Sequence, residues 1–291
     1  MKTKSREDKS SIILMCAYMG PLPYWMPAFM ASCRKNPDVN WLIVTNMDQS
    51  ALPDGPSNVR FLNIDLKDFN DRVSSSLKIP VNVKPEYAYK INDFKVAYGK
   101  IFSKEFEGYD FWGYCDLDVV WGDIKKFITP EILLKYEMIT SRIDRISGHF
   151  CLFKNENRFN EMYKDIPNVK TMMAAERNYA IDEEFITNYL YMVHKPNWVI
   201  RLKYFNKFGG FVKPNVYWNK VLTTSGAHQR ALGDGTKRHF LWKNGQVFDA
   251  DETELMYIHF HKMKKDMHTI NFDYNDSVNE FIINREGLFL S

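Results

Sequence analysis

The stretch FWGYCDLDVVWGDI, residues 111–124, is an apolar run interrupted by two carboxylates, Asp116 and Asp118. In open α/β sheets, ligands bind outside the carboxyl ends of the strands. Two aspartates two residues apart in an extended segment project to the same side and can bind one cation together. A turn-forming pair is the alternative, but Val119 and Val120, which follow, do not resemble a polar turn. The stretch therefore predicts a metal or phosphate site at the end of a buried strand.

Strand-like and helix-like patterns alternate along the rest of the chain. Runs of β-branched and aromatic residues predict strands, and apolar residues at helical spacing predict helices. Besides the quoted stretch, the predicted strands are 12–18, 41–45, 58–64, 150–154 and 256–260, and the predicted helices are 24–33, 66–77, 89–106 and 178–190. Asn244-Gly245 between two apolar runs predicts a tight hairpin. This order predicts an α/β fold with a mixed central sheet flanked by helices.

Length and composition are those of a globular protein. The 291 residues, of which 45% are hydrophobic, suffice for one large α/β domain or two small ones. The 15% of aromatic residues indicates a bulky core more often than a sugar-stacking surface. The four cysteines form no C-x-x-C pair, so we expect buried thiols in a reducing cytoplasm. The apolar segment 12–30 is broken by one glycine and three prolines, which argues against a signal peptide or a membrane-spanning helix.

Positive charge is concentrated in residues 185–248. This segment holds ten Lys and Arg against Asp234 alone, a local net charge of +9, whereas the whole chain carries +3. Such a segment favours an anionic partner, for example a diphosphate or the inner face of the cytoplasmic membrane as a peripheral contact. No nucleic-acid-binding signature accompanies the basic residues, so no nucleic acid partner is expected. A solvated basic face without a partner is the alternative.

The Asp-x-Asp motif after an apolar strand resembles the DxD motif of nucleotide-sugar glycosyltransferases with the GT-A fold. The wider stretches YKINDFKVAYGKIF, YDFWGYCDLDVVWGDI and ISGHFCLFKN are similar to bacterial glycosyltransferase-like proteins associated with capsule and O-antigen polysaccharide biosynthesis. The resemblance extends from residue 12 to about residue 265. It implies a GT-A (Rossmann-like nucleotide-diphospho-sugar transferase) fold. It also implies transfer of a sugar from a nucleoside-diphosphate sugar to a glycan or lipid-linked oligosaccharide acceptor.

The resemblance further implies that the DxD carboxylates hold Mn²⁺ or Mg²⁺, which bridges the donor diphosphate. Asp118 would be the direct ligand, and Asp116 would contact the metal or the ribose. Chemistry gives an independent reason, because breaking a sugar–phosphate bond leaves negative charge on the diphosphate and a divalent ion stabilises that charge. Two carboxylates need a further ligand to complete the coordination shell.

The segment YIHFHKMKK, residues 257–265, is the candidate for that ligand. In a strand, His259 and His261 face the same way, and lysines follow at once. Several GT-A families carry a carboxy-terminal histidine on the metal, which on this resemblance implies His259 as the ligand and His261 as the second choice. Lys262 or Lys264 would then neutralise the phosphate. A surface histidine pair beside a basic cluster is the alternative.

Two further segments are candidates for the sugar pocket. Gly148 and His149 precede a predicted strand, where backbone and imidazole can approach a donor hydroxyl, although a plain turn is equally consistent. Asp182 and Glu183 lie in the first turn of a predicted helix, where the helix dipole alone already favours carboxylates. In GT-A enzymes an acidic pair near this place acts as a base or orients the sugar, and Asp182 is the first candidate for that role.

The resemblance gives a domain division. We expect a disordered N-terminus (1–10), a single GT-A glycosyltransferase domain (11–270) and a C-terminal tail (271–291). Within the domain, 11–125 would form the nucleotide-binding part and 126–270 the acceptor and sugar part.

Two other classes of function remain open at this stage. A strand ending in D-x-D also resembles haloacid-dehalogenase-type phosphatases, in which Asp116 would be the nucleophile and Asp118 the general acid/base. The mid-chain position of the motif argues against this class, as does the lack of a paired-aspartate metal motif downstream. A non-catalytic carbohydrate-binding protein on a transferase fold is the third class.

Overall fold

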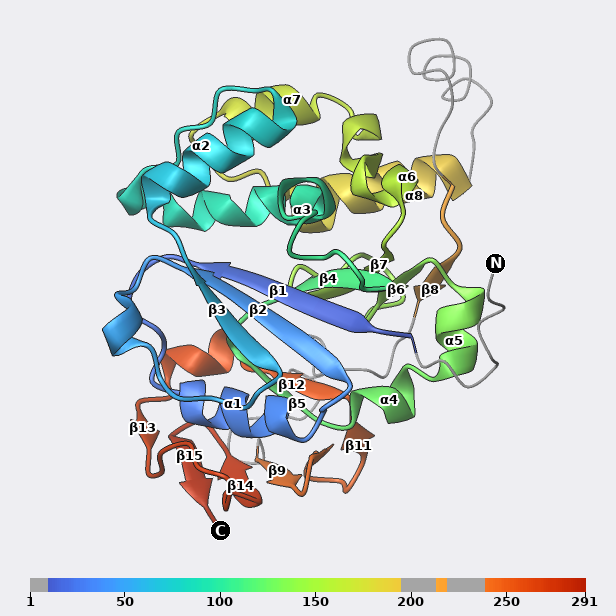
Figure 1. The fold of residues 1–291 in the computed structure, drawn as a ribbon. Coiled ribbons are helices and arrows are strands. Elements are labelled where there is room, and N and C mark those ends of the chain that lie inside the picture. Colours follow the sequence, from blue (N-terminus) through green and yellow to red (C-terminus); the bar gives the residue numbers. More distant parts are fainter. Residues whose placement is uncertain (1–9, 195–212, 219–238) are drawn as a thin grey trace.

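The computed structural model describes residues 10–194, 213–218 and 239–291 (Figure 1). The expected disordered N-terminus and most of the basic segment 185–248 therefore lie outside the described residues. The side chains of His261 and Lys262 also lie outside them.

A seven-stranded mixed sheet forms the centre of the molecule, in the order β3-β2-β1-β4-β7-β6-β8. β1, β2, β3 and β4 run parallel, β7 is antiparallel to both β4 and β6, and β8 is parallel to β6. The strands span β1 Ile12–Tyr18, β2 Val39–Thr45, β3 Val59–Asn63, β4 Phe111–Cys115, β6 Met138–Thr140, β7 Phe150–Lys154 and β8 Val216–Trp218. The predicted α/β class with a mixed central sheet flanked by helices is confirmed.

Helices cover both faces of this sheet (Figure 1). α2 (Leu66–Leu77) begins where the side chain of Asp65 accepts a hydrogen bond from the Asp68 N–H, and it buries Phe69 and Val73 against the sheet. α3, α6, α7 and α8 lie on the same side as α2, and α1 lies on the other. The remaining helices span α1 Met26–Arg34, α3 Tyr98–Ile101, α4 Ile124–Phe127, α5 Pro130–Lys135, α6 Asn157–Asn160, α7 Val169–Ala174 and α8 Ile186–His194.

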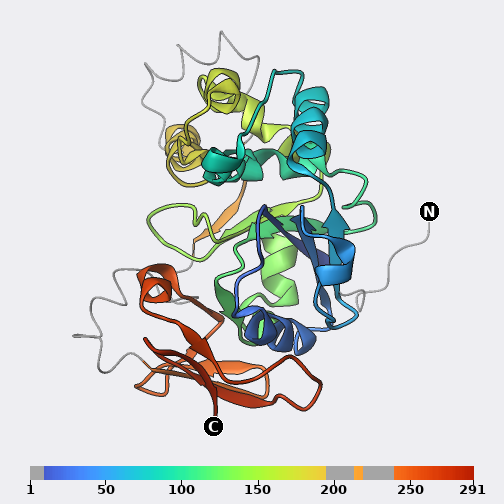
Figure 2. The same cartoon turned by 90° about the vertical axis from the view of Figure 1, so that its left-hand side faces the viewer.

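A second sheet of six strands packs against α1 in the order β11-β10-β9-β14-β15-β13 (Figure 2). α1 is buried on both sides, because Phe29 and Met30 face the central sheet while Ala28 and Ala31 contact the second sheet. These strands span β9 Phe240–Lys243, β10 Gln246–Phe248, β11 Glu254–Leu255, β13 Thr269–Ile270, β14 Glu280–Ile283 and β15 Gly287–Leu290. The expectation of a tail at 271–291 needs correction, since this segment supplies β14 and β15 and buries apolar side chains.

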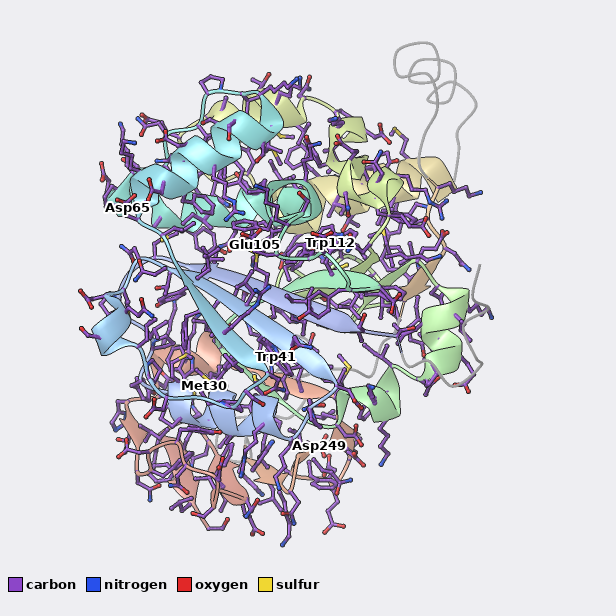
Figure 3. All side chains as sticks on the ribbon, in the orientation of Figure 1. Met30, Trp41, Asp65, Glu105, Trp112 and Asp249 are labelled. Atoms are coloured by element: carbon purple, nitrogen blue, oxygen red, sulfur yellow. The ribbon has the colours of Figure 1, made fainter. Side chains whose placement is uncertain are left out.

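The apolar cores on the two faces of the central sheet contain many of the aromatic residues. Trp112 stacks on Phe153 at a centroid distance of 4.5 Å on one face of the central sheet, and Trp41 packs near Trp121 at 6.0 Å on the other (Figure 3). All four cysteines are buried and free, as expected. No helix in the described ranges is long and apolar enough to cross a bilayer.

The prediction of a single long helix at 89–106 is wrong. The chain forms a 3-10 segment, η2 (Pro85–Ala97), with a kink at Tyr87, followed by the short α3. Lys90 and Asp93 are buried there, and they bond to a distant loop rather than facing solvent. Apolar spacing alone does not distinguish a regular α-helix from this arrangement, in which tertiary hydrogen bonds decide the local geometry.

The hairpin at Asn244-Gly245 is present between β9 and β10. Both residues have positive φ, 50° and 88°, as a tight turn of this kind requires. The helix predicted at 178–190 begins with a π-helical turn, η4 (Ile181–Phe185), which continues into α8.

Candidate metal and donor site

Asp116, Asp118 and His259 converge at the carboxyl end of β4. One ligand atom from each lies within 4.8 Å of the others, and we call these residues the metal cluster. The bend at 116–118 joins β4 to β5 (Val119–Trp121), so the two aspartates do not lie in one extended strand as the sequence suggested. Their side chains still meet, since β12 (Tyr257–His259) pairs antiparallel with β5 and sets His259 opposite Val119.

Asp118 is the most enclosed acid of the metal cluster, with 5% of its surface exposed. Its Oδ2 lies 3.3 Å from His259 Nε2 and 2.6 Å from Lys264 Nζ. Burial opposes ionisation, but the neighbouring His259 and Lys264 outweigh it and hold the pKa of Asp118 below its usual value. Asp118 is therefore a carboxylate suited to bind a cation at neutral pH.

Lys95 is a site residue that sequence reasoning missed. Its buried Nζ donates to Asp116 Oδ1 at 2.5 Å and to the Gly148 carbonyl at 2.8 Å. The same nitrogen lies 3.6 Å from Asp182 Oδ2. Lys95 therefore joins the metal cluster to the segment that carries Asp182.

Asp182 and Glu183, which we call the acid pair, pack directly on Gly148. The Gly148 N–H donates to Glu183 Oε1 at 3.1 Å. A Cβ on Gly148 would lie 2.7 Å from that oxygen and 2.8 Å from Asp182 Oδ2, so only glycine fits without displacing the acid pair. Burial, opposed by Lys95 and reinforced by Glu183 and Asp116, raises the pKa of Asp182 to about 7.

His149 lies against the metal cluster. Its ring stacks on the ring of His259 at a centroid distance of 4.0 Å and an interplanar angle of 22°. Burial, with His259 adding to it, lowers the pKa of His149 well below its usual value, so the imidazole is neutral. Among the described residues, its buried Nε2 has no hydrogen-bond partner, which leaves a polar atom available to a ligand.

A buried ion pair holds the acid pair in place from behind. Asp93 accepts a hydrogen bond from the Tyr179 N–H at 3.0 Å and another from the Ile181 N–H at 3.1 Å. Lys90 Nζ lies 2.8 Å from Asp93 Oδ2 and also donates to the carbonyls of Met172 and Arg177. Segment 90–95 therefore supports both the metal cluster and the acid pair.

Two adjoining cavities share Asp116 and Asp118 of the metal cluster in their walls. The apolar cavity, about 360 Å³, is walled by side chains that include Tyr18, Met19 and Trp25. The polar cavity, about 350 Å³, is lined by the acid pair, Gly148, His149, His259, Lys95 and Lys265, among others. Residues common to both walls are Tyr89, Asn92, Asp116, Asp118 and Lys264.

The metal cluster fits a divalent cation by the chemistry of its donors. Two carboxylates and one imidazole match the oxygen and nitrogen ligands that Mn²⁺ accepts, and Mg²⁺ accepts the carboxylates. The cluster leaves room for further ligands, because both cavities reach Asp116 and Asp118. Of the residues singled out from the sequence, Asp116, Asp118, His259, Gly148, His149, Asp182, Glu183 and Lys264 all line the polar cavity. The Lys262 side chain lies outside the described part of the chain.

Several solved structures of glycosyltransferases are similar to this chain. An active-site mutant of the galactosyltransferase LgtC matches with 12% identity and a TM-score of 0.34, covering 76% of this chain and 93% of its own. Mouse xyloside xylosyltransferase 1 matches with 13% identity and a TM-score of 0.38, covering 72% and 97%. GlyE of Streptococcus pneumoniae TIGR4 matches with 13% identity and a TM-score of 0.30, covering 65% and 44%. These likenesses are too distant to carry a statement about activity.

A comparison with curated protein sequences finds no match. One family model, described as a family of unknown function, matches residues 14–289. The chain therefore belongs to the family DUF6625.

Proposed function

We propose that the protein is a metal-dependent glycosyltransferase that moves a sugar from a nucleoside-diphosphate sugar to a glycan or lipid-linked acceptor. The observation that carries the proposal is that an apolar cavity and a polar cavity share a wall that contains Asp116 and Asp118 of the metal cluster. A nucleoside-diphosphate sugar has the same order of parts, with a flat base at one end, a charged diphosphate in the middle and a polyol at the other end.

The donor is proposed to lie across both cavities. The base and ribose would occupy the apolar cavity beside Tyr18 and Trp25, and the sugar would occupy the polar cavity. The diphosphate would then lie at the shared wall, where Lys264 offers a cation. Lys262 is the second candidate for phosphate contact.

Asp116, Asp118 and His259 would hold Mn²⁺ or Mg²⁺. The bound ion supplies positive charge to the diphosphate as the sugar–phosphate bond breaks. Lys95 would keep Asp116 oriented through its 2.5 Å contact, while Lys264 adds a second positive charge on the leaving side.

The acid pair, Gly148 and His149 are proposed to bind the sugar. Gly148 permits the close approach of the acid pair, and the unpartnered Nε2 of neutral His149 can bond a hydroxyl. Asp182, with a pKa of about 7, can take up the proton of the acceptor hydroxyl or hold the sugar through its hydroxyls.

The acceptor and the cellular setting are proposed from the sequence resemblance. Bacterial capsule or O-antigen polysaccharide synthesis would supply a growing glycan or a lipid-linked oligosaccharide as acceptor. The reaction would take place in the cytoplasm, with the basic segment 185–248 touching the inner face of the membrane. Co-sedimentation with anionic but not neutral liposomes tests that contact.

The test of the proposed activity is a thermal-shift panel of UDP, GDP, CDP and CMP, each with Mn²⁺ and with EDTA. A ligand that binds only the folded protein raises the melting temperature by mass action. We expect one nucleotide to raise it in the presence of metal alone. Asp118→Ala should abolish that shift, whereas Asp54→Ala, at an exposed aspartate in the loop before β3 that lines neither cavity, should not.

Other results would point to other functions. Phosphate release from p-nitrophenyl phosphate would favour the phosphatase alternative. Metal-independent binding of glycans without turnover of any donor would favour a carbohydrate-binding protein. A full shift retained in Asp118→Ala would refute the metal assignment.

A further inference from the structure

Lys264 occupies the side of Asp118 that faces His259. Its Nζ lies 2.6 Å from Asp118 Oδ2, and His259 Nε2 approaches the same oxygen at 3.3 Å. A cation held jointly by Asp118 and His259 would need the position next to Oδ2. Lys264 and the metal therefore compete for one carboxylate oxygen.

The two lysines that contact aspartates of the metal cluster, Lys95 and Lys264, differ in their freedom to move. The Lys95 side chain is 3% exposed and its Nζ is fixed by three oxygen atoms. The Lys264 side chain is 44% exposed and lines both cavities, so it can leave Asp118 without unpacking the core. A diphosphate at the shared wall would offer it a new anionic partner within the same cavities.

We propose that Lys264 exchanges between Asp118 and the donor diphosphate, and that this exchange makes metal and nucleotide bind cooperatively. The inference rests on the proposed function. Metal binding alone breaks the contact between Lys264 and Asp118 and leaves an unpaired ammonium group beside the ion. A diphosphate pairs with that ammonium group, so each ligand favours the binding of the other, as thermodynamic linkage requires.

The test compares Mn²⁺ binding to wild type, Lys264→Met and Lys265→Met, followed by the electron paramagnetic resonance signal of free Mn²⁺. Titrations are run alone and with the nucleotide that the thermal-shift panel identifies. Lys265 is the matched control, because it is exposed, carries the same charge and lines the same polar cavity. Methionine keeps the length of the side chain and removes its charge.

Lys264→Met should bind Mn²⁺ alone about five- to tenfold more tightly than wild type, because the competing ammonium group is gone. The same variant should bind the nucleotide at saturating Mn²⁺ about five- to tenfold more weakly, because its phosphate partner is lost. Lys265→Met should stay within about twofold of wild type for Mn²⁺ alone. A residue with a merely structural role would not move the two affinities in opposite directions.

Unchanged or weaker Mn²⁺ binding by Lys264→Met would overturn the exchange, and so would an equal gain in Lys265→Met, which would reveal a general charge effect. If wild type binds the nucleotide with Mn²⁺ but Lys264→Met shows no gain for the metal, the exchange alone is refuted. If wild type binds Mn²⁺ but none of the nucleotides, the proposed function fails and the exchange fails with it.

Discussion

Replacing Asp182 by asparagine should stabilise the folded protein above neutral pH. The side chain is 5% exposed, and burial is the main reason that its pKa is raised from 3.8 to about 7. Between these two values the unfolded chain has released the proton while the folded chain still holds it. The contribution to stability is therefore present at low pH and is lost as the pH rises through about 7.

The size of this loss follows from the pKa values. A shift of about three pKa units at 1.36 kcal/mol per unit corresponds to about 4 kcal/mol. Asparagine has nearly the same shape, still offers an oxygen towards Lys95 and cannot ionise. The free energy of unfolding of Asp182→Asn should thus equal that of wild type near pH 4 and should exceed it by about 4 kcal/mol above pH 7.

Urea unfolding in EDTA at about pH 4.5, 6 and 8.5 measures this difference, since ΔG extrapolates linearly with denaturant. Asp54→Asn is the control, because it removes the same charge from an exposed position. A constant difference between Asp182→Asn and wild type across these pH values would refute the argument that buried Asp182 resists ionisation. A variant less stable than wild type at the highest pH would refute it as well.

Three further substitutions test other parts of the site and fold. Gly148→Ala should keep metal-dependent binding of the nucleoside diphosphate but should lose the extra affinity that the sugar adds, because the new Cβ displaces the acid pair. Titration calorimetry with the nucleoside diphosphate and with the nucleoside-diphosphate sugar measures this difference. Lys95→Met should lower the free energy of unfolding by about 3–5 kcal/mol, since it leaves the buried carboxyl of Asp182 and the half-buried carboxylate of Asp116 without their ammonium partner, and a loss below 1 kcal/mol in urea would contradict this. Gly287→Ala should lower it by about 3 kcal/mol, because Gly287 has φ 154° and a Cβ there would lie 1.9 Å from the Thr269 carbonyl oxygen; unchanged urea unfolding would contradict this.

Local sequence patterns predict the parts of this fold whose geometry is set locally. The helix at 66–77 has its predicted bounds, because its Asp65 cap and its apolar spacing are both encoded within a dozen residues. The sequence also predicts that Asp118 and His259 meet, and they do so because β12, which ends at His259, pairs with β5, which begins directly after Asp118.

Other features depend on contacts between distant segments, and the sequence does not encode them locally. Lys90, Asp93 and Lys95 are charged residues of the predicted helix 89–106, yet all three are buried. Apart from Asp116, their partners include Tyr179 before α8 and the Gly148 carbonyl, both more than fifty residues away along the chain. The signal that could have found them is three charged residues within the six-residue run 90–95, beside the apolar Ile91 and Phe94.

The C-terminal segment was undervalued for a related reason. In residues 271–291 the apolar runs FII and LFL are only three residues long, and polar and turn-forming residues separate them. Phe281 and Ile283 become buried because β14 pairs with β9. Pairing across such a distance is set by tertiary structure rather than by local propensity.

The charged side chains around the polar cavity support the proposed joint binding of the metal and the donor. Four carboxylates line it, those of the acid pair, Asp116 and Asp118, against the three lysines Lys95, Lys264 and Lys265. Because Asp182 has a pKa of about 7, this lining is close to neutral at physiological pH. A divalent cation alone would give it an excess of positive charge inside a partly enclosed space, which is costly. A diphosphate alone would give this nearly neutral lining an excess of negative charge. The opposite charges of the two ligands cancel. The arrangement of charges in the site therefore favours binding of the metal–diphosphate pair over binding of either ligand alone.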